Sequence, residues 1–523
     1  MHETAEAHGP ARAEANGGAH AAPVDDTRIR SALEHHRRER APRLQNFWGY
    51  FRNHEAPAGH APLDSPAAPP TGGGRRLFQE RGLPRRLTGD PDGLLRDDRQ
   101  RREIVIENDI AWRIQTMVDF LFGREVRIVS RLEDETKRTR ADLALAAAWE
   151  ASGGLALLQD VALLGHVYGY VDLVLRLDED AILRGARTIR RAIEAGRRPD
   201  LRGLVEIEPI EPRRGAPVPS ERDWRTLDAL LIAVEREVAR PGPKRPERVR
   251  RLFGGRSRDG ARRERVELLE VIERGGTRFY EGGELRRATR SVLLPGHLPV
   301  VHVQNLSQPF CYEGIGEVEG LIPLQDELNT RLSDRASRVT LQSFRMYLAK
   351  GLDGFADGPV GPGQVFSTDN HEASIEAFGG DGESPSESEH VAQIREALDR
   401  SSAVPPVASG SLQGRVGNLS SGNALRITML GLITKTERKR ITYGHAIERL
   451  SAMVLAALDR AGALPGGLAE AGARVVWPDV LPLGDAEAVR SAQTKVELGV
   501  DRGRVLAELG YGAPEGAEDE GSV

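Results

Sequence analysis

Beyond residue 320 the 523-residue chain reads as long helices joined by two irregular connections, and this pattern constrains the fold most. Pro323 can occupy the first turn of a helix that runs to about Phe344. A second helix is predicted over Ser386–Ser401, and a long helix capped by Ser420 or Ser421 runs to about Ala461. The connections are an acidic, Gly/Asp-rich, strand-poor insertion at 351–383 and a Gly-rich loop at 403–419.

Residues 104–320 mix helical and strand patterns. Apolar residues recur at helical spacing over Asn108–Phe122, Ala141–Ala151 and Leu155–His166. Residues 171–177 alternate apolar and polar, which predicts a half-buried strand, and 262–305 reads as strands with a turn at 281–283. The predicted fold class is therefore α+β and mainly helical.

The N-terminal 103 residues are predicted to be a largely disordered arm and linker. Residues 1–26 lack any period, and 53–76 are rich in Pro, Ala and Gly. Between them, 27–52 is a basic helical stretch whose aromatics are expected to dock on the body: Phe47, Trp48, Tyr50 and Phe51.

Composition excludes several classes of protein. Net charge is −5, so nothing global indicates nucleic-acid binding. The one cysteine, Cys311, excludes a disulfide framework within the chain. No run of 18 apolar residues and no signal-peptide pattern occurs, so neither a membrane span nor secretion is predicted. Low hydrophobic (39%) and aromatic (5%) contents favour a subunit that depends on neighbours or has long disordered ends.

No catalytic, metal or cofactor site is predicted, and the chain is expected not to be an enzyme. It has no Gly-Lys-Ser/Thr loop, no metal-spaced histidines and no Gly-x-Ser-x-Gly turn. The Gly410–Gly422 loop lacks the lysine of a phosphate-binding loop and is better explained as a connector.

Arginines follow one side of the predicted helix 323–345. At 100° per residue they lie within about 80° of arc, beside a packing stripe of Leu321, Leu328, Leu332 and Val339. One interpretation is a solvated face paired with Asp334 and Glu327; the other is contact with a DNA backbone. The residues of this stripe are Arg331, Arg335, Arg338 and Arg345. A second basic run, Lys435, Arg438, Lys439 and Arg440, is spread around the long helix and is expected to pair with a neighbouring subunit.

Several segments, in their order along the chain, resemble the portal family of tailed bacteriophages, in its siphophage and prophage branch. The resemblance covers about 104–510, while 178–262 is longer and richer in Arg than the family pattern. The segments that carry it are Asn108–Gly123, Leu-Gly-His-Val-Tyr-Gly at 164–169, Leu-Pro-Val-Val-His-Val-Gln-Asn at 298–305, Gly316–Asp326, Leu-Ser-Ser-Gly-Asn-Ala-Leu at 419–425, Trp477–Pro482 and Gly499–Gly510.

The resemblance implies a portal fold of wing, stem, clip and crown that forms a cyclic ring, a dodecamer, around a DNA channel at one capsid vertex. The expected divisions are an arm (1–103), a wing (104–320), a first stem helix (321–345), a clip (346–385), a second stem helix (386–402), a tunnel loop (403–419), a long wing-to-crown helix (420–461), a crown (462–510) and an acidic tail (511–523). Truncation of 1–75 is expected to leave ring formation intact, because that segment has the composition of a disordered arm.

Site residues and partners follow from the same resemblance. The stem arginines and Arg415 are expected to line the channel and contact double-stranded DNA without sequence preference; the alternative for Arg415 is a surface loop whose arginine faces solvent. The tunnel loop is expected to use Val404, Pro405, Pro406, Gly410, Gly414 and Gly417. The clip is expected to bind the terminase large subunit and then a head-tail adaptor through Asp353, Asp357, Asp369, Glu372 and Glu376.

The protein is thus expected in the virion, assembled in the host cytoplasm beside the major capsid and scaffolding proteins. The alternatives are a packaging enzyme, terminase or nuclease, which would need a phosphate-binding loop or a carboxylate metal site, and another structural protein of the head or neck.

Overall fold

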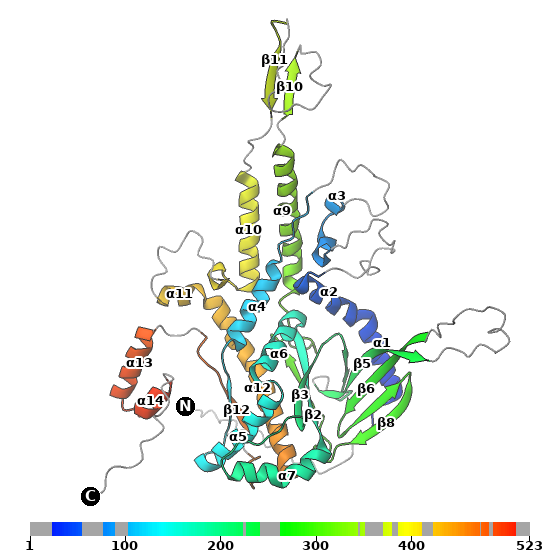
Figure 1. Cartoon of the computed structure of the whole chain (residues 1–523), viewed down its shortest axis with the longest axis vertical. Coiled ribbons are helices and arrows are strands. Elements are labelled where there is room, and N and C mark those ends of the chain that lie inside the picture. The colour runs from blue at the N-terminus through cyan, green and yellow to red at the C-terminus, as the bar shows by residue number, and fades with distance from the viewer. Residues whose placement is uncertain are drawn as a thin grey trace, which may run out of the picture.

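A mixed body carries a two-helix stem that rises to a small hairpin along the longest axis of the molecule (Figure 1). The computed structural model describes residues 23–54, 77–88, 103–222, 226–240, 262–343, 346–350, 370–378, 385–409, 422–470, 472–480, 485–500 and 502–508.

Helices and a three-stranded antiparallel sheet form the main core of the body. Trp149 illustrates the packing: its ring is buried and its Nε1 donates a hydrogen bond to Ser451 Oγ at 3.0 Å, which joins two helices far apart in sequence. The elements are α4 (Asp109–Phe122), α5 (Glu135–Ala151), α6 (Gly154–Tyr168), α7 (Glu179–Glu194), α12 (Leu430–Arg460) and the sheet β3 (Val205–Ile210), β2 (Tyr170–Leu177), β9 (Val300–Gln304).

The central strand β2 is buried on both faces over residues 170–175, so the prediction of a half-buried strand is wrong. Val171, Leu173 and Leu175 pack into the helical core, whereas Val174 packs on the other side with residues of the neighbouring sheet. The polar residue in the alternation, Asp172, is also buried and accepts hydrogen bonds from His302 and Tyr312.

A five-stranded antiparallel sheet stands beside this core. Its β7–β8 turn lies at Gly282 and Gly283, whose φ angles of 59° and 85° require glycine, and this confirms the turn predicted at 281–283. The strands, in sheet order, are β4 (Gly215–Pro219), β5 (Leu227–Arg240), β6 (Arg262–Glu273), β7 (Gly276–Glu281) and β8 (Glu284–Arg290).

The N-terminal segment belongs to the body. Helix α1 (Asp26–His35), a π-helical turn (His36–Arg40) and α2 (Ala41–Arg52) lie against it (Figure 1). Buried Ile29 and Leu33 pack on the five-stranded sheet, and Phe47, Tyr50 and Phe51 enter a cluster with α4 and α6. The predicted docking of these aromatics is confirmed. The prediction that 1–103 is largely disordered is wrong for 23–54 and for 77–88, which contains the 3-10 turn η2 (Phe78–Gly82) and α3 (Arg85–Thr88).

The C-terminal part returns to the body through β12 (Ala473–Val476), which pairs with β1 (Arg127–Ser130). The single long helix predicted over 420–461 is two helices, α11 (Gly422–Thr428) and α12, with the break at Met429; Ser420 and Ser421 lie outside the described residues. Two further helices follow, α13 (Asp485–Glu497) and α14 (Arg502–Glu508).

Among the described residues, no single helix is long and apolar enough to cross a membrane. Only α5 and α6 meet that criterion together, as a pair bent by 63°.

Candidate functional site

The stem consists of α9 (Ile322–Ser343), which follows the short turn η4 (Glu319–Leu321), and α10 (Pro385–Ser402) beside it (Figure 1). The helices predicted over 323–344 and 386–401 are therefore confirmed. Val391, Ile394 and Leu398 of α10 share a buried cluster with Leu328 at the base of α9. At the far end, β10 (Met346–Lys350) pairs antiparallel with β11 (Ser374–Phe378), so the insertion is not as strand-poor as predicted.

One face of α9 holds an extended chain segment through side chains spaced four residues apart. Gln325, Asn329, Ser333 and Ser337 accept hydrogen bonds from the backbone N–H groups of Asp109, Glu107, Val105 and Glu103 at 3.0 to 3.1 Å. We call these four pairs the side-chain ladder. Because every second amide of an extended chain points the same way, one helix face satisfies alternate N–H groups as a neighbouring strand would.

The ladder continues into the N-terminal segment. Buried Asn329 donates to Gln79 Oε1 at 3.0 Å, and Gln79 donates in turn to the Tyr50 carbonyl and to Asn108 Oδ1. Tyr50 also donates its hydroxyl to Asp326 at 2.9 Å. Gly82 lies over that carboxylate, and a Cβ there would stand 1.9 Å from Asp326 Oδ1. The base of α9 is thereby fixed by contacts from three separate parts of the chain.

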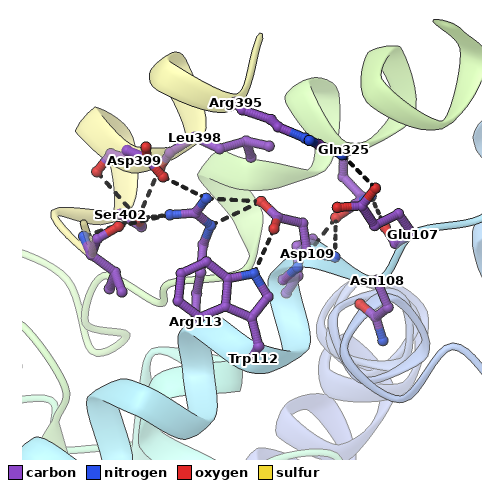
Figure 2. A network of polar contacts seen from close by, with 12 residues as sticks. Glu107, Asn108, Asp109, Trp112, Arg113, Gln325, Arg395, Leu398, Asp399 and Ser402 are labelled. Atoms are coloured by element: carbon purple, nitrogen blue, oxygen red, sulfur yellow. Dashed lines mark hydrogen bonds and ion pairs between the residues drawn. The ribbon is translucent and has the colours of Figure 1, made fainter. Parts of the chain in front are cut away.

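Arg113 of α4 forms the matching anchor for α10, as Figure 2 shows. Its side chain is only 2% exposed and its guanidinium donates to Asp109, to Asp399 and Ser402 of α10, and to the Val404 carbonyl at 2.7 to 3.0 Å. The guanidinium also lies 4.5 Å from the Trp112 ring. Two carboxylates and two neutral acceptors leave this buried cation fully paired, which makes the junction specific in geometry.

A second buried charge cluster connects the end of α10 to helix α12. Glu317 is held by Lys439 at 2.8 Å and by Lys435, which also donates to the Ser402 carbonyl at the end of α10. Burial alone would raise the pKa of Glu317, but the two ammonium groups outweigh it and lower the pKa to about 2. Burial lowers the pKa of Lys439 to about 8; the Glu317 carboxylate opposes this shift, and the neighbouring Lys435 ammonium adds to it. The expected pairing of Lys435 and Lys439 with a neighbouring subunit is therefore wrong.

The predicted arginine stripe is partly neutralised within the chain. Arg331 pairs with Glu327 at 2.7 Å and with Asp334, and Arg338 pairs with Glu387 of α10. Arg335 is exposed, and no ion pair joins it to any of the described residues. Of the predicted packing stripe, Leu321 and Leu328 are buried, whereas Val339 is 53% exposed because it lies beyond the body. Arg345 lies outside the described residues.

The predicted tunnel-loop and clip residues fall largely outside the described part of the chain. Val404 is fully buried against Met117 and Leu432, so it is core and cannot line a channel. Pro406 begins a 3-10 turn (Pro406–Ser409) directly after Pro405, and Glu372 and Glu376 are exposed at the hairpin. The residues outside are Gly410, Gly414, Arg415, Gly417, Asp353, Asp357 and Asp369.

An Asp–His pair that the sequence did not reveal lies in the sheet. His302 Nδ1 faces Asp172 Oδ1 at 2.8 Å, and its Nε2 faces the Tyr312 carbonyl at 2.7 Å. Both ring nitrogens thus face oxygen atoms of the chain itself, so neighbouring groups of the sheet and the 305–317 connection hold the ring in place. Within the described ranges no three His, Cys, Asp or Glu residues gather as a metal site would require.

No protein-family model and no curated protein matches the chain. Solved structures similar to it include a chain of the "Neck of empty GTA particle computed with C6 symmetry", 15% identical, with a TM-score of 0.37, covering 83% of this chain and 92% of that one. Another is a chain of the "Virion of native gene transfer agent (GTA) particle", 14% identical, with a TM-score of 0.35 and coverage of 76% and 99%. Both are chains of gene transfer agent particles, and TM-scores this low do not by themselves establish a common fold.

Proposed function

We propose that this protein is a structural protein of the head or neck of a phage particle and, more specifically, the portal subunit that forms the ring channel for DNA entry and exit. The observation that carries the proposal is the stem. Two packed helices leave a mixed body, end in a hairpin and return to a further long helix, in the element order that the sequence resemblance implies for wing, stem, clip and crown.

Exposed apolar side chains support assembly into an oligomer. Ile427, Leu430 and Ile441 along α11 and α12 are 60 to 66% exposed, and Leu498 after α13 is 79% exposed. Apolar side chains exposed to water do not stabilise a monomer, whereas neighbouring subunits in a ring would bury them. The paired state of Arg331 and Arg338 also suits a channel wall, because DNA must slide past it without being gripped.

The proposed partners are those of a portal: double-stranded DNA in the channel, the terminase motor and later a head-tail adaptor at the clip, and capsid and scaffolding proteins around the wing. The proposed location is the portal vertex of the virion after assembly in the host cytoplasm.

The test is the assembly state. Purified protein is expected to run as a ring of about twelve 57.2 kDa subunits with a central channel in negative-stain images. A monomer, or a closed assembly without a channel, would contradict the portal proposal.

DNA-packaging assays then test the channel residues and the clip residues separately. Arg335→Ala and Arg415→Ala are expected to keep the rings intact and to reduce packaged or retained DNA. Asp353 and Asp357 replaced together are expected to weaken motor docking.

A further inference from the structure

Helix α7 and the segment that follows it expose a run of arginines at the surface of the body. The apolar residues Ile182, Ala186, Ile189 and Ile193 of the helix are buried, and its other side faces solvent. Residues 180–202 hold three acidic residues against seven arginines, all seven exposed, although the whole chain has a net charge of −5. The arginines are Arg184, Arg187, Arg190, Arg191, Arg197, Arg198 and Arg202.

Few of these cations have a partner among the described residues. Arg190 pairs with Glu194 at 2.8 Å and Arg198 pairs with Glu150, whereas no such ion pair or hydrogen bond engages the guanidinium groups of Arg184, Arg187 and Arg191. At steps of three and four residues these last three share one face, opposite the buried isoleucines. They form an arginine row about 10 Å long, since a helix rises about 1.5 Å per residue.

We propose that this arginine row, together with Arg197 and Arg202, binds the phosphate backbone of double-stranded DNA outside the channel. Duplex DNA carries one charge per about 1.7 Å of axis, so a row about 10 Å long can reach several phosphates at once. Arginine supplies charge and several N–H donors without reading bases.

A protein partner fits this surface less well. Protein interfaces combine arginines with aromatic or aliphatic anchors that become buried, and here Leu183 is the one large apolar side chain exposed along α7. A phosphate backbone needs no such anchor, because counterion release supplies the free energy of binding.

The position of α7 in the molecule relates the arginine row to the proposed function. The helix lies at the end of the long axis opposite the β10–β11 hairpin (Figure 1). If the hairpin is the clip outside the capsid, α7 faces the interior, where DNA is packed. That placement rests on the proposed function, whereas the binding itself does not.

The test measures the salt dependence of binding to a fluorescent duplex of arbitrary sequence, about 24 base pairs long, by anisotropy with the full-length protein. In R184A/R187A/R191A, affinity is expected to fall at least about tenfold at low salt. The slope of log K against log salt is expected to become shallower by about 2.7, since each phosphate that is no longer neutralised removes about 0.9 from the slope. The control R30A/R38A/R52A removes three exposed arginines from α1, its π-helical turn and α2, changes the net charge equally and is expected to keep the parent slope.

Unchanged affinity and slope in the α7 variant would overturn the proposal. So would a loss of binding to polyglutamate with no loss of DNA binding, which would assign the row to an acidic protein segment. Because ring assembly is measured separately, failure of the portal proposal remains distinguishable: a monomer that loses DNA affinity on R184A/R187A/R191A supports this inference alone.

Discussion

At the scale of single residues, Glu317 is the carboxylate that pairs with two ammonium groups, the buried one of Lys439 and the partly buried one of Lys435. Glu317→Gln leaves both cations without a counter-ion and is expected to lower the free energy of unfolding by about 3–5 kcal/mol. Lys439→Met is expected to cost less, since Lys435 still pairs with the carboxylate. Chemical denaturation of both variants measures the difference, and equal losses would show that the charge balance is unimportant.

The same carboxylate predicts a pH dependence. Its pKa in the folded protein, about 2, lies below its usual value, so its contribution to stability is complete above about pH 4.5 and is lost as pH falls toward 2. Glu317→Gln should therefore flatten acid unfolding within that window.

Asp326 predicts a dependence of the opposite sign. Burial raises the pKa of Asp326 to about 6, although the Tyr50 hydroxyl partly offsets the shift. The folded state then holds its proton more tightly than the unfolded state, so stability falls as pH rises from about 4 to about 6.

Asp326→Asn keeps an oxygen for Tyr50 and removes the charge. It is expected to raise stability at pH 7 by about 1 kcal/mol and to abolish this pH dependence. Asp334→Asn, which loses ion pairs to Arg86 and Arg331, should instead lower stability slightly. Melting temperatures across about pH 4–7 distinguish the two variants, and a destabilised Asp326→Asn would contradict the assigned pKa.

At the scale of elements, the side-chain ladder predicts an alternating pattern of amide protection. The N–H groups of Val105, Glu107 and Asp109 are bonded to α9 and should exchange with solvent more slowly than those of Ile104 and Ile106. Residue-resolved hydrogen exchange provides the measurement. Asn329→Ala should remove protection at Glu107 and cost about 1–3 kcal/mol, because it leaves buried polar groups unpaired. Uniform exchange along 103–109 would show that the ladder does not form.

How far the sequence predicted these elements depends on whether the signal was local. The stem helices were predictable, because their periodicity lies within each segment. The ladder was not: Gln325, Asn329 and Ser333 show the spacing of four, but Asn329 and its partner Glu107 are 222 residues apart.

Buried charge escaped prediction for a similar reason. Arg113 and Glu317 look like surface residues in the sequence, since only the packing of distant segments places their partners around them. The arginine stripe was visible, but the pairing of Arg338 with Glu387 depends on how α10 folds back.

At the scale of the whole molecule, the N-terminal helices act as part of the body. Leu44, Phe47 and Tyr50 of α2 are at most 5% exposed. Each such side chain contributes about 1.5–3 kcal/mol, and a whole domain is stable by only about 5–15 kcal/mol. Removal of 1–75 is therefore expected to give an insoluble or unfolded chain, contrary to the expectation from sequence that rings would still form.

Point variants avoid the ambiguity of a deletion. Phe47→Ala is expected to cost about 3–5 kcal/mol, whereas Arg52→Ala on the same helix, with an exposed side chain, should change stability by less than about 0.5 kcal/mol. Thermal unfolding compares the two, and similar melting temperatures would mean that the segment is dispensable.

The two repeats that meet in the side-chain ladder differ in length. Four residues of α9 advance about 6.0 Å, whereas two residues of the extended segment advance about 6.7 Å, so the two repeats drift by about 0.7 Å at each rung. The side chains shorten from Gln325 through Asn329 to Ser333 and Ser337 and absorb part of that drift. Because the two repeats differ in length, side chains of α9 and amides of the extended segment can meet in only one alignment, and only over a few pairs. The mismatch therefore fixes a single register between the extended segment and α9. It also limits how far that segment can run along the helix, and so sets the point along α9 at which the stem leaves the body.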